Sequence, residues 1–412
     1  MLEKIKISAF EWILIGSVIH SLGSFFFGSS RMLCYVLCGA GLAIILYNAI
    51  FRLKYRNELK GFSLVLFYIY LLWSVFIAIR PFVNSEKFTT DGYSMINIYT
   101  WLSLTTPLIM LLGFQNISLK SIFKYSLLQG IIGVVLLIIN SKKIFGVDQN
   151  FSADGEDYQK YIALLGLPLQ FLSASSFMLL CNKFLPSKGK LLSFLMILLA
   201  VFTSLFTARR GNAFMYGLIL VFSLLIYVFA SQKGSAVKNF IIVTGLVALG
   251  FIFFNSFGQS TFSLLMTRLD EDTRAGVEDQ MIYSFKNTPL DWIIGRGIDG
   301  NYFCAPCGMT AMRGEIETGY LQLILKGGIV YLVMFVGFLL TSAYKGLFQT
   351  NNTMSKAMAL YLIAHIIFLV PFGLPAFNFE YLIVWICVLY CQSKEFRMLS
   401  DNQVMNMIYL YK

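Results

Sequence analysis

Long apolar runs, each of roughly 17 to 25 residues, follow one another along almost the whole of this chain. A helix needs a run of that length to cross the hydrocarbon core of a bilayer. Hydrophobic residues make up 58% of the chain and charged residues only 13%, about half the share found in soluble domains, which excludes a water-soluble fold. We therefore predict an all-α, polytopic membrane protein with about twelve transmembrane helices. The predicted spans are 9–28, 32–51, 61–79, 95–114, 121–140, 162–181, 191–207, 212–230, 239–257, 319–343, 355–372 and 376–392.

Residues 1–412 are predicted to form a single transmembrane domain with two longer loops on the same side of the membrane. The smaller loop, 141–160, is polar and acidic, and the larger loop, 258–318, is the longest non-spanning stretch. The remaining connections are mostly short. Because long loops in compact proteins usually bind or cover a ligand, we expect any chemistry to take place on the side of these two loops.

Basic residues mark alternate connections and so predict the orientation of the chain. By the positive-inside rule both termini lie in the cytoplasm, and the two long loops lie on the exoplasmic side. This arrangement places 18 Lys and Arg against 4 acids in the cytoplasm, and 13 against 15 outside. Orientation thus accounts for the net charge of +11, and no nucleic-acid partner is predicted. The marking residues are Arg52, Lys54, Arg56 and Lys60, then Lys120 and Lys124, then Lys183, Lys188 and Lys190, then Lys233 and Lys238.

Arginine is distributed unevenly across the predicted membrane. Eight of the eleven Arg fall on the exoplasmic side, whereas the cytoplasmic loops use mainly Lys. The planar guanidinium suits bidentate contact with phosphate, which a Lys ammonium cannot make. We infer an anionic, phosphate-bearing ligand at the exoplasmic face, with pairing between these Arg and acids on the same side as the open alternative.

Within the large loop, residues 263–285 carry apolar side chains at near-helical spacing, which predicts an amphipathic helix on the membrane surface. Asp270 and Asp272 have the spacing of a metal-binding pair, but a solvated helix face accounts for them better. Cys304 and Cys307 have CxxC spacing. Since the loop adds no further Cys or His, a local disulfide is favoured over zinc, and two thiols stay an open alternative. No metal site is predicted.

Three segments between about residues 200 and 340 resemble bacterial O-antigen polymerases and O-antigen ligases. Residues 207–214 (Thr-Ala-Arg-Arg-Gly-Asn-Ala-Phe) are similar to the Ser-Arg-Gly signature of that family. Residues 268–274, followed by 287–302, are similar to its loop arginine and to the "Pro, apolar, Gly-x-Gly, aromatic" segment after it. Residues 317–332 are similar to the pattern that ends the long loop and enters the next span.

The resemblance implies a GT-C-like membrane glycosyltransferase of surface-polysaccharide and lipopolysaccharide biosynthesis in the bacterial cytoplasmic (inner) membrane. Such an enzyme transfers a growing glycan from undecaprenyl pyrophosphate to a lipid-linked repeat unit at the exoplasmic (periplasmic) face. It is metal-independent and needs no cofactor or nucleotide sugar. The implied partners are the undecaprenyl-pyrophosphate-linked oligosaccharide, membrane lipid and a polysaccharide chain-length regulator.

Carried over by position, Arg210 matches the signature arginine and Arg274 the loop arginine, and both are predicted to stabilise the leaving pyrophosphate. Glu317 stands where ligases of this family typically carry His. A carboxylate can still deprotonate a sugar hydroxyl, so Glu317 is predicted as the base and a polymerase is favoured over a ligase. The predicted substrate-binding residues are Arg209, Arg268, Arg296, Arg313, Glu315 and Tyr320.

Alternative roles stay open for these residues, as does the function itself. Arg209 and Arg210 could instead contact lipid headgroups. Glu317 could have only a structural role, capping the N-terminus of the following helix. An O-antigen ligase is one alternative function. A polysaccharide flippase or secondary transporter is a second, because ionisable residues within spans are functional by default. Those residues are few and scattered: Glu11, His20, Lys326, His365 and Glu380.

Overall fold

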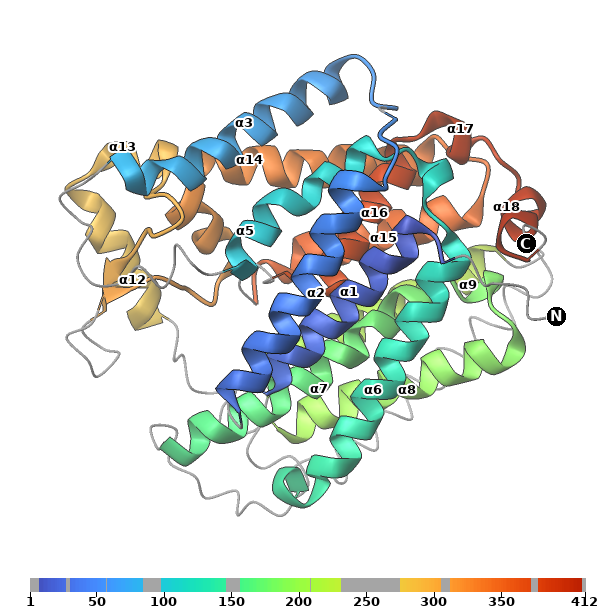
Figure 1. Cartoon of the computed structure of the whole chain (residues 1–412), viewed down its shortest axis with the longest axis horizontal. Coiled ribbons are helices and arrows are strands. Elements are labelled where there is room, and N and C mark those ends of the chain that lie inside the picture. The colour runs from blue at the N-terminus through green and yellow to red at the C-terminus, as the bar shows by residue number, and fades with distance from the viewer. Residues whose placement is uncertain are drawn as a thin grey trace.

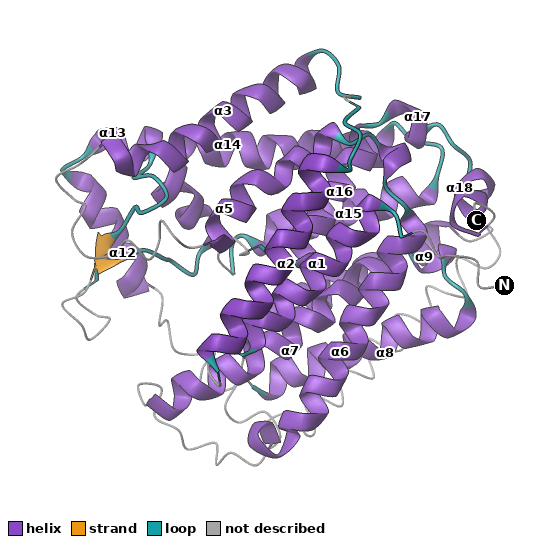
Figure 2. Cartoon of the chain, viewed as in Figure 1, coloured by secondary structure: helices purple, strands orange, loops and turns teal. Residues whose placement is uncertain are grey.

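The described part of the chain is almost entirely helical in the computed structural model (Figures 1 and 2). The structure describes residues 7–26, 30–56, 58–83, 98–145, 156–207, 209–230, 275–304, 312–371 and 377–409. The α-helices are α1 (Ala9–Phe25), α2 (Arg31–Phe51), α3 (Phe62–Val83), α5 (Ile98–Thr105), α6 (Leu119–Phe145), α7 (Glu156–Leu180), α8 (Ser187–Phe206), α9 (Arg210–Ala230), α12 (Ala275–Lys286), α13 (Pro289–Ile294), α14 (Gly319–Phe348), α15 (Thr353–Phe368), α16 (Phe379–Gln392), α17 (Lys394–Arg397) and α18 (Asp401–Tyr409). Short 3-10 helices are η2 (Thr106–Leu111), η3 (Phe114–Asn116) and η4 (Asn182–Phe184). Strands β1 (Tyr302–Phe303) and β2 (Met312–Arg313) pair antiparallel.

Six helices among the described residues are long and apolar enough to cross a membrane: α2, α3, α6, α8, α9 and α14. Shorter apolar helical stretches lie in α1, α5 with η2, α7, α15 and α16, each overlapping another predicted span. The predicted span 239–257 lies outside the described residues. The structure therefore confirms apolar helices of spanning length, while the total of about twelve spans stays a prediction.

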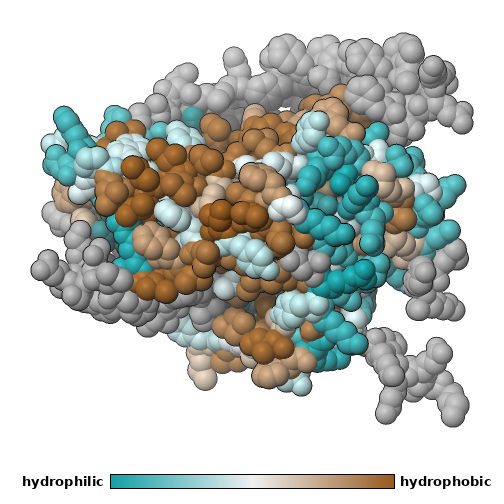
Figure 3. Space-filling view, turned by 90° about the horizontal axis from the view of Figure 1, so that it is seen from above, coloured by the Kyte–Doolittle hydropathy of each residue, from teal (hydrophilic) through white to brown (hydrophobic). Residues whose placement is uncertain are grey.

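Large apolar side chains are exposed on the outer helices. On α2, Met32 and Phe51 are 79% and 73% exposed, and on α3 Phe62 and Leu72 are 74% and 70% exposed. Figure 3 shows one face of the molecule, where apolar residues cover the middle and hydrophilic residues gather towards the two ends, mainly on the right. Exposing so much apolar surface to water is energetically unfavourable, whereas contact between that surface and lipid tails is favourable.

Helix α16 lies at the centre of the molecule, beside α15 (Figure 1). Every residue of α16 from Tyr381 to Gln392 is buried. The indole of Trp385 packs against Tyr70 of α3 and Phe335 of α14, with ring centroids 5.5 and 6.1 Å apart. Because protein surrounds it, α16 contacts neighbouring helices where an outer span would contact lipid.

The segments predicted to be cytoplasmic meet at one end of the bundle, which we call the tail end because it carries α17 and α18. There Lys183, between α7 and α8, forms an ion pair with Asp401 of α18 at 2.6 Å. The N–H of Asn351, between α14 and α15, donates to the carbonyl of Arg397 at 2.8 Å. Connections far apart in sequence thus lie together at this end, while their side of the membrane stays a prediction.

The segments predicted to be exoplasmic meet at the opposite end, which we call the loop end because it carries α12 and α13. Arg80, in the last turn of α3, forms an ion pair with Asp291 of α13 at 3.1 Å. The N–H of Gly319 at the start of α14 donates to the carbonyl of Leu369 after α15 at 2.8 Å. Figure 1 shows α12 and α13 on the opposite side of the molecule from α17 and α18.

The predicted sides of the membrane can be tested with a reporter that is active only outside the cytoplasm. We expect activity when it is fused after Asp154 or Asp291, and none when it is fused after Lys188 or Lys233. Activity assays on membranes with matched fusion levels would measure this. The reverse pattern would invert the orientation and place the loop end in the cytoplasm.

Helix α14 is broken near its beginning by Gly328. This residue has φ 74° and ψ −179°, a backbone conformation essentially limited to glycine. The break is filled by the loop after α13, whose Gly295 also has positive φ, 71°. The two glycines let the backbones touch: a Cβ on Gly295 would lie 2.5 Å from the N of Gly328.

Backbone groups released by the break in α14 find partners in neighbouring segments. The N–H of Arg296 donates to Leu325 O at 2.8 Å, and the Trp73 indole donates to Gly327 O at 2.8 Å. Lys326 turns its ammonium onto the carbonyls of the inserted loop, Ile298 O at 2.9 Å and Gly300 O at 3.0 Å. Buried carbonyls of a broken membrane helix are thereby satisfied inside the protein.

Replacing Gly328 by Ala should strongly destabilise the fold. The conformation disfavours a side chain, and the added Cβ would overlap the carbonyl oxygen of Ile293, so we expect a loss of roughly 2 to 5 kcal/mol. Gly337→Ala on the same helix is the matched control, since its Cβ would meet nothing within 4 Å. Yield and thermal unfolding midpoint in detergent would measure both. Equal yields and unfolding midpoints for the two variants would contradict the close packing described at Gly328.

Candidate active site

The beginnings of α9 and α14 both rest on the turn Leu369–Pro371 at the loop end. Gly319 donates its N–H to Leu369 O, and a Cβ on Gly211 would lie 3.1 Å from Pro371 O. Residues 209–210, 317–318 and 369–371 together form what we call the mouth. The helix start that carries the predicted signature arginine and the one that follows the predicted base thus contact one turn.

Arg210 is the first residue of α9, and Arg209 directly precedes it. Both are partly exposed. The backbone of Arg209 is fixed, because its N–H donates to Ser204 O at 2.8 Å and its carbonyl accepts from the N–H of Ala213 at 3.0 Å. Two guanidinium groups therefore lie at the N-terminus of a long helix, where the helix dipole also favours an anion.

Glu315 and Glu317 present exposed carboxylates just before α14, whereas Ile316 between them is buried. The Ile316 N–H donates to the side-chain oxygen of Gln322 at 2.9 Å. This anchor fixes the segment, and its alternating burial turns both carboxylates outward. They are therefore accessible to a ligand at the mouth.

Thr318, the residue before α14, donates its hydroxyl to the carboxylate of Glu278 on α12. This contact ties the end of the long loop to α12 within the same loop. Tyr320, in the first turn of α14, is partly buried, and its ring hydroxyl is close enough to interact electrostatically with the carboxylate of Glu278. The predicted contact of Tyr320 with substrate stays a prediction.

The long loop packs on a small apolar core of its own rather than only on the membrane bundle. Helix α12 contributes Met281 and Phe285, both fully buried, and α14 contributes Leu325. The predicted amphipathic helix 263–285 is observed as α12 from Ala275 onward, and its earlier part lies outside the described residues. A folded loop can hold polar groups over the mouth in fixed positions.

Tyr302 connects the strand pair to the residues before α14. Its hydroxyl donates to Glu315 O at 3.2 Å, and it pairs in register with Arg313. Burial raises the pKa of Tyr302, while the nearby charges of Arg313 and Glu317 act on that pKa in opposite directions. Arg313, Glu315 and Glu317 therefore lie around Tyr302, the aromatic that ends the segment 287–302 and that the sequence did not predict as a site residue.

Arg296 uses all five of its donors within the protein. Its Nε donates to Asp291 Oδ2 at 2.8 Å, Nη1 to Ser284 Oγ and Asn301 O, and Nη2 to Ser284 O and Thr288 Oγ1. The guanidinium also lies over the Phe285 ring, 4.3 Å from its centroid. This geometry favours a structural role for Arg296. The predicted contact with substrate would need a free N–H donor, and all five are already used within the protein.

Asp291 lies between two arginines. It accepts from Arg296 and, at 3.1 Å, from Arg80, and its side chain is 14% exposed. Burial acts to raise the pKa of Asp291, but the hydrogen bonds from Arg296, Thr288 and Arg80 outweigh it and hold the pKa below its usual 3.8. The carboxylate thus fastens α13 to α3.

Asp291→Asn should lower the stability of the loop end, since losing hydrogen bonds to a charged, partly buried carboxylate typically costs about 1.5 to 3 kcal/mol. Because the folded pKa is lowered, the contribution is complete above the unfolded pKa of about 3.8 and is lost as pH falls through the folded value. The thermal unfolding midpoints of the wild type and of Asp291→Asn, measured in detergent, should therefore differ at neutral pH and converge in acid. Asp279→Asn, at an exposed position of α12, is the control. A constant difference across pH would contradict the role of the ion pair.

Several predicted residues fall outside the described residues. They are Arg268 and Arg274, the acidic pair Asp270 and Asp272, and Cys307. Cys304 is buried and disulfide-bonded. Over the described ranges, no three His, Cys, Asp or Glu side chains are grouped so that they could hold a metal ion.

A buried ionisable pair, His365 of α15 and Glu380 of α16, lies just beneath the mouth. Their side chains approach to 3.1 Å and are 7% and 12% exposed. The second ring nitrogen of His365 contacts Tyr361 O at 2.9 Å, and the backbone carbonyl of His365 accepts from Leu369 of the turn. In the sequence, these two residues are only separate ionisable groups in two spans. Their pairing could not be predicted, because it depends on how the two helices face each other.

Comparisons with protein-family models, with curated proteins and with solved structures found no match. Functional assignment therefore rests on the residues of the mouth and on the three sequence segments between about residues 200 and 340.

Proposed function

We propose that this chain is a polymerase of O-antigen or a related surface polysaccharide, a GT-C-like glycosyltransferase with about twelve spans. One observation supports the proposal: the start of α9, which carries Arg210, and the start of α14, which follows Glu317, contact the same turn at the end of an apolar bundle. An enzyme acting on a lipid-anchored pyrophosphate needs cations and a base at the membrane boundary. The mouth supplies both residue types.

In the proposed reaction, an acceptor hydroxyl of one lipid-linked repeat unit attacks the anomeric carbon of the glycan on a second lipid carrier. The bond from that carbon to the pyrophosphate oxygen breaks, and the leaving pyrophosphate keeps the electron pair. Arg210, with Arg209 and the α9 N-terminus, stabilises the charge on the pyrophosphate. Glu317 takes the proton of the acceptor hydroxyl.

A ligase would use the same chemistry with a different acceptor, and the mouth does not distinguish the two. The carboxylate of Glu317, where ligases typically carry His, supports the polymerase. The buried His365–Glu380 pair supports the second candidate, a proton-coupled flippase or transporter, because ionisable residues at membrane depth often carry protons. Its position directly under the mouth also suits a supporting role in the proposed enzyme.

Lipid-linked glycans extracted from cells that lack this protein would separate the candidates. The polymerase proposal predicts single repeat units on their lipid carrier, outside the cytoplasm. Full polymer still attached to its carrier would indicate a ligase, and units retained inside would indicate a flippase. Either of these two results would refute the proposal.

A further inference from the structure

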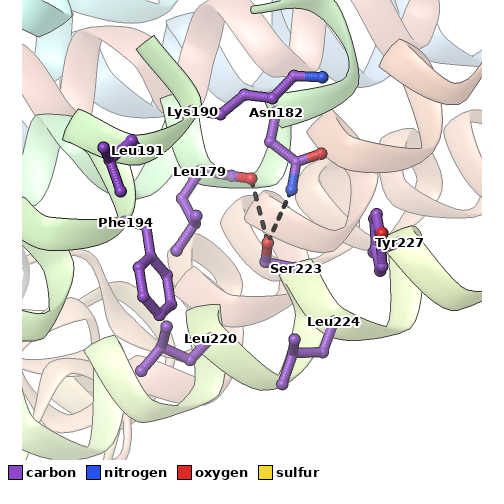
Figure 4. Close-up of a pocket in the computed structure, with 9 residues that line it drawn as sticks. All are labelled: Leu179, Asn182, Lys190, Leu191, Phe194, Leu220, Ser223, Leu224 and Tyr227. Atoms are coloured by element: carbon purple, nitrogen blue, oxygen red, sulfur yellow. Dashed lines mark hydrogen bonds between the residues drawn. The ribbon is translucent and has the colours of Figure 1, made fainter. Parts of the chain in front are cut away.

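A groove lies between α7, α8 and α9 near the tail end, away from the mouth (Figure 4). Its volume is about 280 Å³, close to the lower limit for ligand pockets. The groove is lined by Leu179, Asn182, Lys190, Leu191, Phe194, Leu220, Ser223, Leu224 and Tyr227. It is thus large enough for a segment of one flexible chain.

Long apolar helices form two walls of the groove. Two of its walls, α8 and α9, are helices of spanning length, and Leu191 and Tyr227 at its rim are 60% and 51% exposed. Its polar side chains satisfy one another: Asn182 donates to Ser223 Oγ at 3.3 Å, and Ser223 donates to Leu179 O at 3.2 Å (Figure 4). The remaining surface is mainly aliphatic and aromatic, which suits hydrocarbon.

One end of the groove carries positive charge. Lys190 lies in the first turns of α8, whose N-terminus is also the positive end of the helix dipole, and the first turn holds no acid. Among the described residues Lys183 is neutralised by Asp401, whereas no ion pair involves Lys190. An apolar groove that ends at an exposed cation matches a molecule with a hydrocarbon tail and an anionic head.

We propose that this groove binds an anionic phospholipid, with one acyl chain along Phe194, Leu220 and Leu224 and the phosphate against Lys190. Attraction of an anionic lipid to a single Lys near the membrane surface corresponds to about fivefold in affinity over a neutral lipid. The proposal is independent of the mouth and of the reaction proposed there.

The test uses the purified full-length protein in detergent, titrated with phosphatidylglycerol or phosphatidylcholine and followed by native mass spectrometry. The wild-type protein should prefer phosphatidylglycerol by about fivefold. Lys190→Gln should abolish that preference, while Lys188→Gln, which removes the same charge two positions away and outside the groove, should keep it. Leu220→Trp should fill the groove and reduce binding of both lipids, and Leu225→Trp, on a lipid-facing position outside it, should not.

Two results would overturn the proposal. Equal loss of preference in the Lys188 and Lys190 variants would show that general surface charge attracts the lipid. Unchanged lipid binding by Leu220→Trp would show that the lipid lies elsewhere. Since Lys190 is exposed, its variant should fold normally, so the charge comparison holds even if the Trp variant is unstable.

Discussion

Arg210→Ala should reduce polymer formation by a factor of roughly a hundred to a thousand, while the protein still inserts in normal amounts. Losing a positioned donor aimed at charge in the transition state typically has an effect of this size. Arg210 begins α9, where its guanidinium and the helix N-terminus would act on the same pyrophosphate. Polymer length and amount in cells, normalised to membrane-inserted protein, would measure the effect.

Arg31→Ala is the matched control, because Arg31 also begins a helix on the predicted exoplasmic side and is exposed. It should form polymer normally. Arg210→Lys should be intermediate, since it keeps the charge and loses the fork. We expect Arg274→Ala to resemble Arg210→Ala, and Arg268 and Arg313 to have graded effects. Wild-type polymer from Arg210→Ala would refute its role.

Glu317→Gln should be inactive and Glu317→Asp partly active if Glu317 is the base. Gln keeps the shape and much of the hydrogen bonding but cannot accept the proton. A purely structural role, as a favourable acid beside the N-terminus of α14, is worth only about 0.3 to 1 kcal/mol and would leave Gln active. The observed N-cap residue is Thr318, so Glu317 lies one position before it.

Glu315→Gln is the comparison for Glu317, because both carboxylates are exposed on the same segment. We expect Glu315→Gln to retain most activity. An active Glu317→Gln with an inactive Glu315→Gln would move the base to Glu315. Activity of both variants would leave the mechanism without a base from this segment.

The helices could be predicted from the sequence because hydropathy along a chain needs no knowledge of neighbours. The position of each helix in the bundle could not. Helices α2 and α16 both appear as apolar runs, yet Met32 of α2 is exposed and Trp385 of α16 is fully buried. Which apolar run faces lipid and which faces protein depends on packing between helices. The break at Gly328 was also missed, since Gly-Gly in a membrane helix is common enough to be tolerated.

For the candidate site, the sequence placed Arg210 and Glu317 at the ends of two spans on the same side, and the structure brings those ends to one turn. It could not show that the Gly-x-Gly segment fills the break in α14, or that Arg296 spends its donors inside the protein. The residue type alone does not show whether a guanidinium donates to a phosphate or to backbone carbonyls. The His365–Glu380 pair was missed for a related reason, because a hydropathy pattern does not record the rotation of one helix against another.

The proposed polymerase activity is tested most directly with the purified protein reconstituted in lipid vesicles and supplied with undecaprenyl-pyrophosphate-linked repeat units from the same bacterium. No nucleotide sugar or metal is added, and the products are separated by size. Polymerase activity predicts a ladder of lengthened glycans on the lipid carrier and released undecaprenyl pyrophosphate, with both products reduced by roughly a hundred- to a thousandfold for Arg210→Ala. Repeat units that stay single in the presence of folded wild-type protein would contradict it.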